Sequence, residues 1–228
     1  MKKLSPRVWL TLVLVGLVGQ FAWTIENMYF NVYLYNTIST DPGYISAMVG
    51  WSAAAATLTT LLMGALSDRV GKRKLFICGG YLLWGLSTAA FGLVTVENAA
   101  KLFPAAAATA AAAVMIVVLD CVMTFFGSTA NDAAFNAWIT DITCEENRGR
   151  VEGVNSAMPL LAMLAVFGGA LFFMIVRPDG TVTYDYPLFF TIVGVAVMAL
   201  GAGVLLFMDD SAPGRAPTGG YLASALYG

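Results

Sequence analysis

Three acidic residues, Glu26, Asp120 and Asp132, lie within long apolar stretches of the chain. An ionised side chain at the centre of a bilayer costs about 2.5 to 17 kcal/mol, depending on the method, so an intramembrane acid is a candidate functional group. No Lys or Arg lies in the same stretches to pair with these acids. Such acids could bind and release protons or hold a polar solute.

Polar side chains accompany the three acids at helical spacing. The first stretch carries a stripe at steps of three and four residues, with Glu26 at its edge: Gln20, Trp23, Thr24, Asn27 and Asn31. The stretch with the two aspartates carries a second stripe at strict intervals of four: Asp120, Thr124, Ser128, Asp132, Asn136 and Thr140. Because lipid offers these groups no hydrogen-bond partners, the stripes must face protein or water. We expect them to line a polar path; the alternative is that they bond one another across a helix interface.

The composition is that of an integral membrane protein. Of the 228 residues, 59% are hydrophobic, and the mean hydropathy is +0.76. The net charge is −2 and the basic residues form no common face, so no nucleic-acid partner is expected. The chain has no histidine, and its three cysteines, Cys78, Cys121 and Cys144, show no paired spacing. We therefore expect no disulfide framework, no metal or cofactor site and no enzymatic activity.

Six apolar stretches are long enough to cross a bilayer as helices, since about 20 residues span the hydrocarbon. We expect these helices at residues 8–36, 44–66, 75–95, 114–139, 153–176 and 187–208, in one bundle over residues 1–208. Residues 209–228 would be a cytoplasmic tail or the start of a linker, and residues 105–113 an interfacial helix or the outer end of the fourth helix. Pro159 should bend the fifth helix, because it cannot donate a backbone hydrogen bond.

The basic residues predict the orientation of these helices in the membrane. Only Lys101 and Arg177 fall on one side. The other side, which we expect to be cytoplasmic, has ten basic residues: Lys2, Lys3, Arg7, Arg69, Lys72, Arg73, Lys74, Arg148, Arg150 and Arg215. The chain is therefore expected to be a multi-pass protein of the cell (plasma or inner) membrane, with both termini in the cytoplasm.

Residues 64–74, between the second and third apolar stretches, carry five ionisable side chains and must lie in water. Gly64 should let the end of the preceding helix pack closely on a neighbour, and Gly71 should adopt the positive φ of a tight turn. The pattern Gly64-x-x-x-Asp68-Arg69-x-Gly71-Lys72-Arg73-Lys74 resembles the signature loop between helices 2 and 3 of the major facilitator superfamily of secondary transporters. The alternative is a basic loop that only fixes topology.

The resemblance implies a role for this loop. Asp68 would take part in charged contacts that hold one transporter conformation, with Arg69 and Arg73 as partners. Asp141 or Glu145, after the fourth helix, would meet the loop.

The resemblance also implies an all-α architecture. The six helices would form the N-terminal half of a major facilitator fold, built as two inverted three-helix repeats. The first and fourth helices, which carry the polar stripes, would then be symmetry mates lining a central cavity. A second six-helix half would complete the path; a truncated chain, a split gene product and a half that pairs with another chain remain open.

A narrower resemblance covers the first five helices. Gly19-Gln20-Phe21-Ala22-Trp23 and Asn131-Asp132-Ala133-Ala134-Phe135-Asn136-Ala137-Trp138 are similar to segments of glycoside-pentoside-hexuronide:cation symporters. In these sugar carriers an aspartate of the fourth helix contacts sugar, which implies that role for Asp132. Trp23 and Trp138 would stack on an apolar sugar face or serve in packing.

Glu26 and Asp120 are the candidate proton carriers. The sodium-coupled sugar carriers have acids in helix 2, and residues 44–66 contain none, so a proton would replace sodium here. The two acids lie at similar depths, about ten residues inward from Asn36 and about six from Val114. Two dehydrated acids without a basic partner should not both be ionised, so we expect at least one to be protonated at neutral pH. The alternative is a wet vestibule in which each accepts hydrogen bonds and titrates normally.

These patterns predict secondary active transport of a small polar solute, a sugar or glycoside, by alternating access with proton coupling. The partners would be the lipid bilayer, the solute, H⁺ and a second six-helix half. The alternative is a non-transporting membrane subunit, a receptor or an inactive truncated fragment, which would keep the loop but have no need of the polar stripes.

Overall fold

The computed structural model describes residues 4–208 of the chain. Within this range, six helices are long and apolar enough to cross a membrane: Pro6–Ile38, Pro42–Val70, Arg73–Phe91, Ala105–Ile142, Arg148–Phe173 and Tyr186–Phe207. The predicted six-helix, all-α fold is therefore confirmed. Lys2, Lys3, Arg215 and the predicted tail at residues 209–228 lie outside the described residues.

Two of the six spans are composite. The first runs through α1 (Pro6–Ile25), the π-helical η1 (Glu26–Phe30), α2 (Asn31–Tyr33) and the π-helical η2 (Leu34–Ile38). The fourth runs through the 3₁₀ turn η3 (Ala105–Ala107), α6 (Ala108–Gly127), the π-helical η4 (Ser128–Phe135) and α7 (Asn136–Ile142). The alanine-rich stretch is thus the outer end of the fourth helix and not a separate interfacial helix.

The other spans are α3 (Pro42–Val70), α4 (Arg73–Phe91), α8 (Arg148–Ala170) with the 3₁₀ turn η5 (Leu171–Phe173), and α9 (Tyr186–Phe207). A short helix, α5 (Val96–Ala100), connects α4 to the fourth span. Local sequence sets several helix starts: Ser5, Asp41 and Asp185 each accept a backbone N–H in the first turn, and proline follows within two positions.

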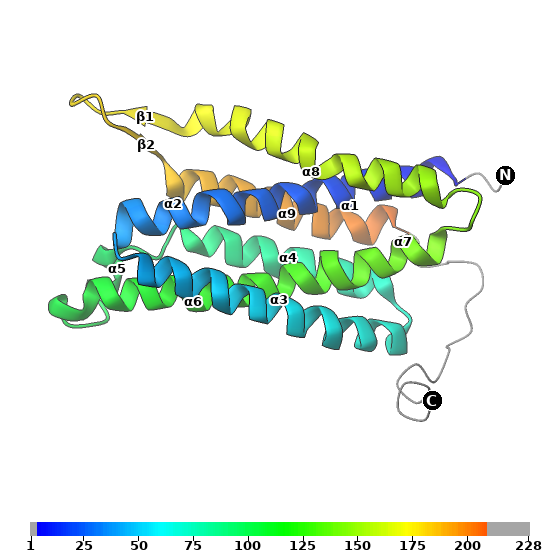
Figure 1. Ribbon diagram of the computed structural model, residues 1–228, viewed down its shortest axis with the longest axis horizontal. Coiled ribbons are helices and arrows are strands. Elements are labelled where there is room, and N and C mark those ends of the chain that lie inside the picture. Colours follow the sequence, from blue (N-terminus) through cyan, green and yellow to red (C-terminus); the bar gives the residue numbers. More distant parts are fainter. Residues whose placement is uncertain (1–3, 209–228) are drawn as a thin grey trace.

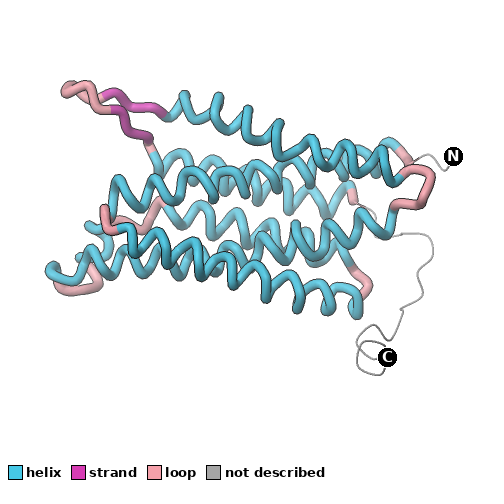
Figure 2. The backbone as a smooth tube through the Cα atoms, in the orientation of Figure 1, coloured by secondary structure: helices cyan, strands magenta, loops and turns pink. Residues whose placement is uncertain are grey.

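The spans form an elongated bundle in which consecutive helices run in opposite directions (Figures 1 and 2). We call the end with the start of α1, the α3–α4 connection and the α7–α8 connection the basic end, and the opposite end the hairpin end. The most extensive packing joins α4 to α9; α1 packs on α8, and α3 on α6 and η4. Two inverted three-helix repeats relate the first span to the fourth, the second to the fifth and the third to the sixth. The contact of the first span with the fifth is accordingly repeated as the contact of the fourth span with the second, and the third span packs on the sixth.

Glycines allow α4 and α9 to approach closely. A Cβ added at Gly85 would lie 2.7 Å from the Met198 backbone nitrogen, and a Cβ added at Gly194 would lie 2.7 Å from the Ala89 Cβ. Small residues at a helix crossing let backbones pack where no hydrophobic effect drives helices together in lipid.

The signature loop is shorter than predicted. Helix α3 continues to Val70, so Asp68 and Arg69 are helical, and only Gly71 and Lys72 connect α3 to α4. Gly71 ends the helix at φ +68°, the left-handed conformation that the sequence predicted. Among residues 4–208, a Cβ at Gly64 would meet no atom within 4 Å, so no helix of the described bundle packs closely there.

The fifth span ends before its predicted limit at residue 176. Its last turn is followed by β1 (Met174–Val176), which pairs antiparallel with β2 (Val182–Tyr184). The β-branched residues of both strands favour extended backbone, and Gly180 at φ +82° supplies the turn. This hairpin projects from the bundle (Figure 1), where the sequence predicted only a polar loop. Helix α8 continues through Pro159.

Candidate functional site

Glu26 lies in a pocket of hydroxyl groups where the first, second and fourth spans meet. The Thr124 hydroxyl donates to Glu26 Oε1 at 3.0 Å, and the Ser52 hydroxyl donates to the same oxygen at 3.3 Å. The two hydroxyl oxygens are 2.7 Å apart. Glu26 is only 8% exposed, so these neutral donors, and not water, provide most of its polar surroundings.

The structure brings the three predicted acids together. Asp120 is one turn before Thr124 on α6, is 2% exposed and has Ser52 beside it. Asp120, and more weakly Asp132, are close enough to repel a charge on Glu26. Every basic residue of the described helices lies in a terminal turn, so none neutralises this cluster.

Several buried polar atoms of this region have no hydrogen-bond partner among the described residues. They are Glu26 Oε2, Asn31 Oδ1, Trp84 Nε1, Asp120 Oδ1 and Ser128 Oγ. Buried polar groups are nearly always hydrogen-bonded in folded proteins, and exceptions concentrate where a proton, water or ligand binds. The unpartnered atoms therefore mark this part of the bundle as the candidate site.

Asp132 lies in η4 on the side of the cluster nearer the basic end. Ser128 and Trp23 lie beside its carboxyl group, which is half-buried. The Trp23 ring packs against Trp84 of α4, with ring centroids 4.9 Å apart. Asp132 thus lies beside the Trp23 ring and near Glu26.

The stripe on the fourth span does not remain on one face. Asp120, Thr124 and Ser128 are buried, Asp132 is half-buried, and Asn136 and Thr140 are exposed. The π-helical η4 begins at Ser128 and has more residues per turn than an α-helix, so a stripe at four-residue spacing changes its direction along this span. The Asn136 amide and the Thr140 hydroxyl each donate to a carbonyl four residues earlier, at 3.1 Å.

The stripe on the first span also divides into inner and outer members. Gln20, Trp23, Thr24 and Asn31 are half-buried, whereas Asn27 is exposed and its amide donates to the Trp23 carbonyl at 2.8 Å. Trp138, which the sequence offered as a sugar-stacking surface, is instead buried and stacks on Phe135 at 5.9 Å.

A second buried network, which sequence reasoning missed, lies beside the acids. The Asn131 amide donates to the Tyr81 hydroxyl at 2.9 Å, and this hydroxyl donates to the Val15 carbonyl at 2.7 Å. Gly19 leaves room for the Asn131 side chain, because a Cβ at this position would collide with the Asn131 amide and lie 2.9 Å from Asn131 Cγ. Ser52 was missed as well, since a single serine among alanines carries no distinctive local signal.

One sequence signal could have found Asn131: an internal repeat at a spacing of 105 residues. Glu26-Asn27-x-x-Phe30-Asn31-x-Tyr33 corresponds to Asn131-Asp132-x-x-Phe135-Asn136-x-Trp138. The structure supports the match, because η1 ends at Phe30 and η4 at Phe135.

Side-chain hydrogen bonds recur at the same spacing. The Asn31 amide donates to the Asn27 carbonyl at 3.2 Å, as Asn136 does to Asp132 at 3.1 Å. The Thr24 and Thr129 hydroxyls each donate to the carbonyl four residues earlier at 2.7 Å. The candidate site is therefore built from two copies of one structural unit.

A charged cluster around Arg73 lies at the basic end. Arg73 pairs with Asp68, donates from Nε to Asp141 at 3.1 Å and donates to the Ser67 hydroxyl at 2.6 Å. The expected contact of Asp141 with the loop is present. Among the described residues Asp68 pairs with Arg73 and not with Arg69, which is exposed because the last turn of α3 points it outward.

Other features of the described region lie apart from the acids. Glu145, the alternative to Asp141, is exposed, and Arg150 lies over the Trp9 ring at 5.2 Å, which joins α8 to α1. No group of three or more potential metal ligands occurs among residues 4–208.

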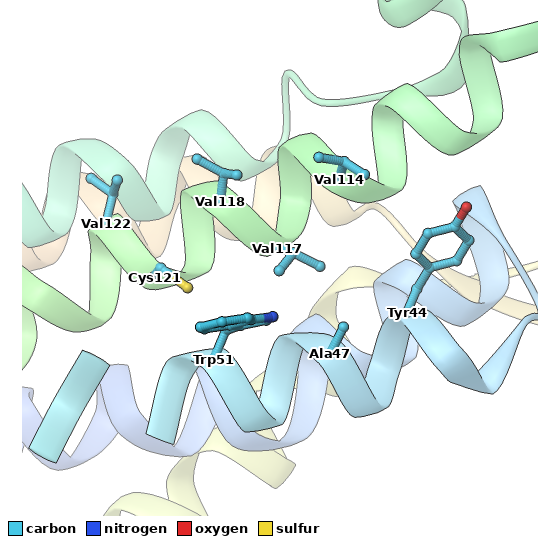
Figure 3. Close-up of a pocket in the computed structure, with 8 residues that line it drawn as sticks. All are labelled: Tyr44, Ala47, Trp51, Val114, Val117, Val118, Cys121 and Val122. Atoms are coloured by element: carbon cyan, nitrogen blue, oxygen red, sulfur yellow. The ribbon is translucent and has the colours of Figure 1, made fainter. Parts of the chain in front are cut away.

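An apolar groove of about 510 Å³ runs between α3 and α6 (Figure 3). The Trp51 ring lies across it, facing Val117 and Cys121. The chain neighbours Ser52 and Asp120 are directed into the bundle toward Glu26 instead. Because no carboxylate or amine lines this groove, it is not the candidate site.

Six membrane-length helices around a buried cluster of acids define a multi-pass membrane protein with a polar interior. The family model described as the Major Facilitator Superfamily matches residues 12–224. The chain therefore belongs to this superfamily and is a membrane transporter of that family. No curated protein and no solved structure matches the chain.

Proposed function

We propose that the chain acts in secondary active transport, moving a small polar solute, a sugar or glycoside, by alternating access coupled to protons. The observation that carries this proposal is the buried pair Glu26 and Asp120 beside the hydroxyls of Ser52 and Thr124. The pair lies on the two symmetry-related spans, away from every basic side chain of the described helices.

Charge balance supports a proton as the coupling ion. Burying one ionised carboxylate without a partner is expensive, and a second nearby carboxylate adds repulsion. A proton taken up by Glu26 or Asp120 removes both costs when the cavity is closed. Release of that proton when the cavity opens to water on the other side would link its movement to the conformational change.

Polar groups near the pair support a hydroxyl-rich solute. Asn27 and Asn136 are exposed, and Asp132 is half-buried, so their oxygens can reach a ligand. Trp23 offers a ring face that can pack against the apolar face of a sugar. A few convergent polar groups beside aromatic rings are typical of small-molecule sites.

The cluster around Arg73 would act as the gate at the basic end. Arg73 links α4 to α3 through Asp68 and to α7 through Asp141. Breaking these pairs would free the second, third and fourth spans to separate at that end. We place this gate in the cytoplasm and both termini beside it, and we propose that a second six-helix half completes the path.

The test is uptake into liposomes that contain the complete transporter. A downstream coding segment for six further helices, if present, would be co-expressed with the full chain. Glu26→Gln and Asp120→Asn, made separately, should abolish accumulation driven by a pH gradient while solute exchange at equal pH persists. Asp179→Asn, in the exposed hairpin, is the matched control and should retain both activities.

Two outcomes would contradict the proposal. Unchanged proton-driven uptake and pH dependence in both variants would exclude these acids as proton carriers. Absence of any uptake by the complete, folded transporter would favour the non-transporting alternative.

A further inference from the structure

The charges of the candidate site are unbalanced even after proton coupling is considered. Glu26 and Asp120 form the buried pair, and Asp132 stands apart from it at a half-buried position. A proton held by the pair leaves Asp132 without a basic partner within the described helices, because their basic residues all lie in terminal turns. A neutral sugar would bury this charge without compensating it.

The internal repeat separates the acids by position. Glu26 corresponds to Asn131, and both side chains are buried within the bundle. Asn27 corresponds to Asp132; Asn27 is exposed and Asp132 is half-buried. The repeat therefore places one acid at the buried position and one at the accessible position, where a solute can reach it.

The accessible groups of this region are hydrogen-bond acceptors. The amide nitrogens of Asn27, Asn31 and Asn136 each donate to a carbonyl of their own helix, at 2.8, 3.2 and 3.1 Å. Because the carbonyl partner must accept, the nitrogen is the atom that is used, and the side-chain oxygen of each residue remains available. Asn31 Oδ1 is buried and has no partner among residues 4–208. Together with the Asp132 carboxylate, these oxygens require a ligand that is rich in donors.

Aromatic rings adjoin the same carboxylate. Trp23 lies beside Asp132, and Trp84 packs on Trp23 at 4.9 Å. Tryptophan is the best partner for a cation over an aromatic face. An ammonium group paired with the Asp132 carboxylate would lie near the Trp23 ring.

We propose that the solute carries a protonated amine and that Asp132 is its counter-ion. An ammonium group has three donors and no acceptor, which matches the available oxygens. Because the proposed function already calls for a sugar or glycoside, and this inference rests on it, the substrate class is an amino sugar or amino glycoside.

The experiment measures binding of three labelled probes to the same complete transporter as in the uptake assay, in detergent, by equilibrium dialysis at neutral pH. Glucosamine carries the amine, glucose lacks it, and N-acetylglucosamine keeps the nitrogen but loses its charge. The chain should bind glucosamine at least about tenfold more tightly than either neutral probe, because a charge-assisted hydrogen bond is roughly twice as strong as a neutral one. Asp132→Asn should remove this preference, and Asp179→Asn should keep it.

A variant that tests the ring guards against misfolding of Asp132→Asn. Trp23→Phe keeps an aromatic ring but is a weaker partner for a cation, so it should weaken glucosamine binding by a larger factor than glucose binding and thereby reduce the preference for glucosamine. Equal binding of the three probes to the unmodified chain, binding of none of them, or a preference that survives Asp132→Asn would each overturn the inference.

Its failure can be told apart from failure of the proposed function. Proton-driven uptake of glucose without preference for glucosamine would leave the transport proposal standing and reject the amine. Asp132-dependent binding of glucosamine without uptake in a pH gradient would support the amine and reject proton-coupled transport.

Discussion

Gly19→Ala should disrupt the buried network beside the acids. The new methyl group would collide with the Asn131 amide and lie 2.9 Å from Asn131 Cγ, where carbon atoms pack at about 3.5–4.0 Å. Asn131 would have to move away from helix α1 and give up its 2.9 Å hydrogen bond to Tyr81. Overpacking of a core costs about 1–3 kcal/mol, and a lost buried hydrogen bond about 0.5–1.5 kcal/mol. We therefore expect the free energy of unfolding to fall by about 2–4 kcal/mol.

The assay is reversible unfolding in mixed detergent micelles, followed by the loss of helical circular dichroism. Gly50→Ala is the matched control, because a Cβ there meets no atom within 4 Å. It should be neutral or stabilising by up to about 1 kcal/mol, the usual gain from replacing a helical glycine. Both substitutions add one methyl group to a membrane helix, so they differ chiefly in what that methyl group meets.

A double-mutant cycle tests the cause of the destabilisation. Asn131→Ala removes one of the two groups that the methyl would strike, the Tyr81 hydroxyl being the other, so Gly19→Ala should cost less in that background than in the unmodified chain. The reasoning is refuted if Gly19→Ala is as stable as Gly50→Ala. Strict additivity of Gly19→Ala and Asn131→Ala would also refute it, because the two changes would then act independently.

Three further predictions concern the ends of the bundle. Arg73→Lys should lower the free energy of unfolding by about 1.5–3 kcal/mol, because one ammonium group cannot bond all three partners of the guanidinium. Arg69→Lys is the control and should not change the free energy of unfolding. Equal effects of the two substitutions on unfolding in micelles would argue against the cluster. The Thr181 hydroxyl and backbone N–H donate to Asp179 and hold the pKa of that carboxyl below its ordinary value. The hairpin should therefore be most ordered at neutral pH and lose this stabilisation as the pH falls through the lowered pKa, seen as faster hydrogen exchange that Asp179→Asn makes insensitive to pH. In a chain without other cysteines, an impermeant thiol reagent added outside cells should label Asp179→Cys but not Lys72→Cys; labelling of Lys72→Cys would reverse the proposed orientation.

The sequence alone was enough to predict the class of fold and the candidate acids. Helices long enough to cross a bilayer follow from runs of apolar residues, because lipid leaves the backbone no other way to satisfy its hydrogen bonds. The same physics singled out Glu26, Asp120 and Asp132, since each is costly in such a run whatever its neighbours are. The pattern around Asp68 and Gly71 was equally local and predicted the turn, whereas the contact of Asp141 or Glu145 with the loop was implied only by the resemblance to the superfamily.

The tertiary structure decided which groups meet those acids. Ser52 contacts Glu26, and Asn131 contacts Tyr81, only because each helix has a particular rotation about its axis and a particular position along it. The π-helical segments change the rotation of the residues that follow them, and no strong local sequence pattern predicts these segments. They leave Asn136 exposed although it continues the stripe that Asp120 begins in the core. Contacts between distant segments depend on how all six spans pack at once, and hydrophobic patterning along one helix does not contain that information.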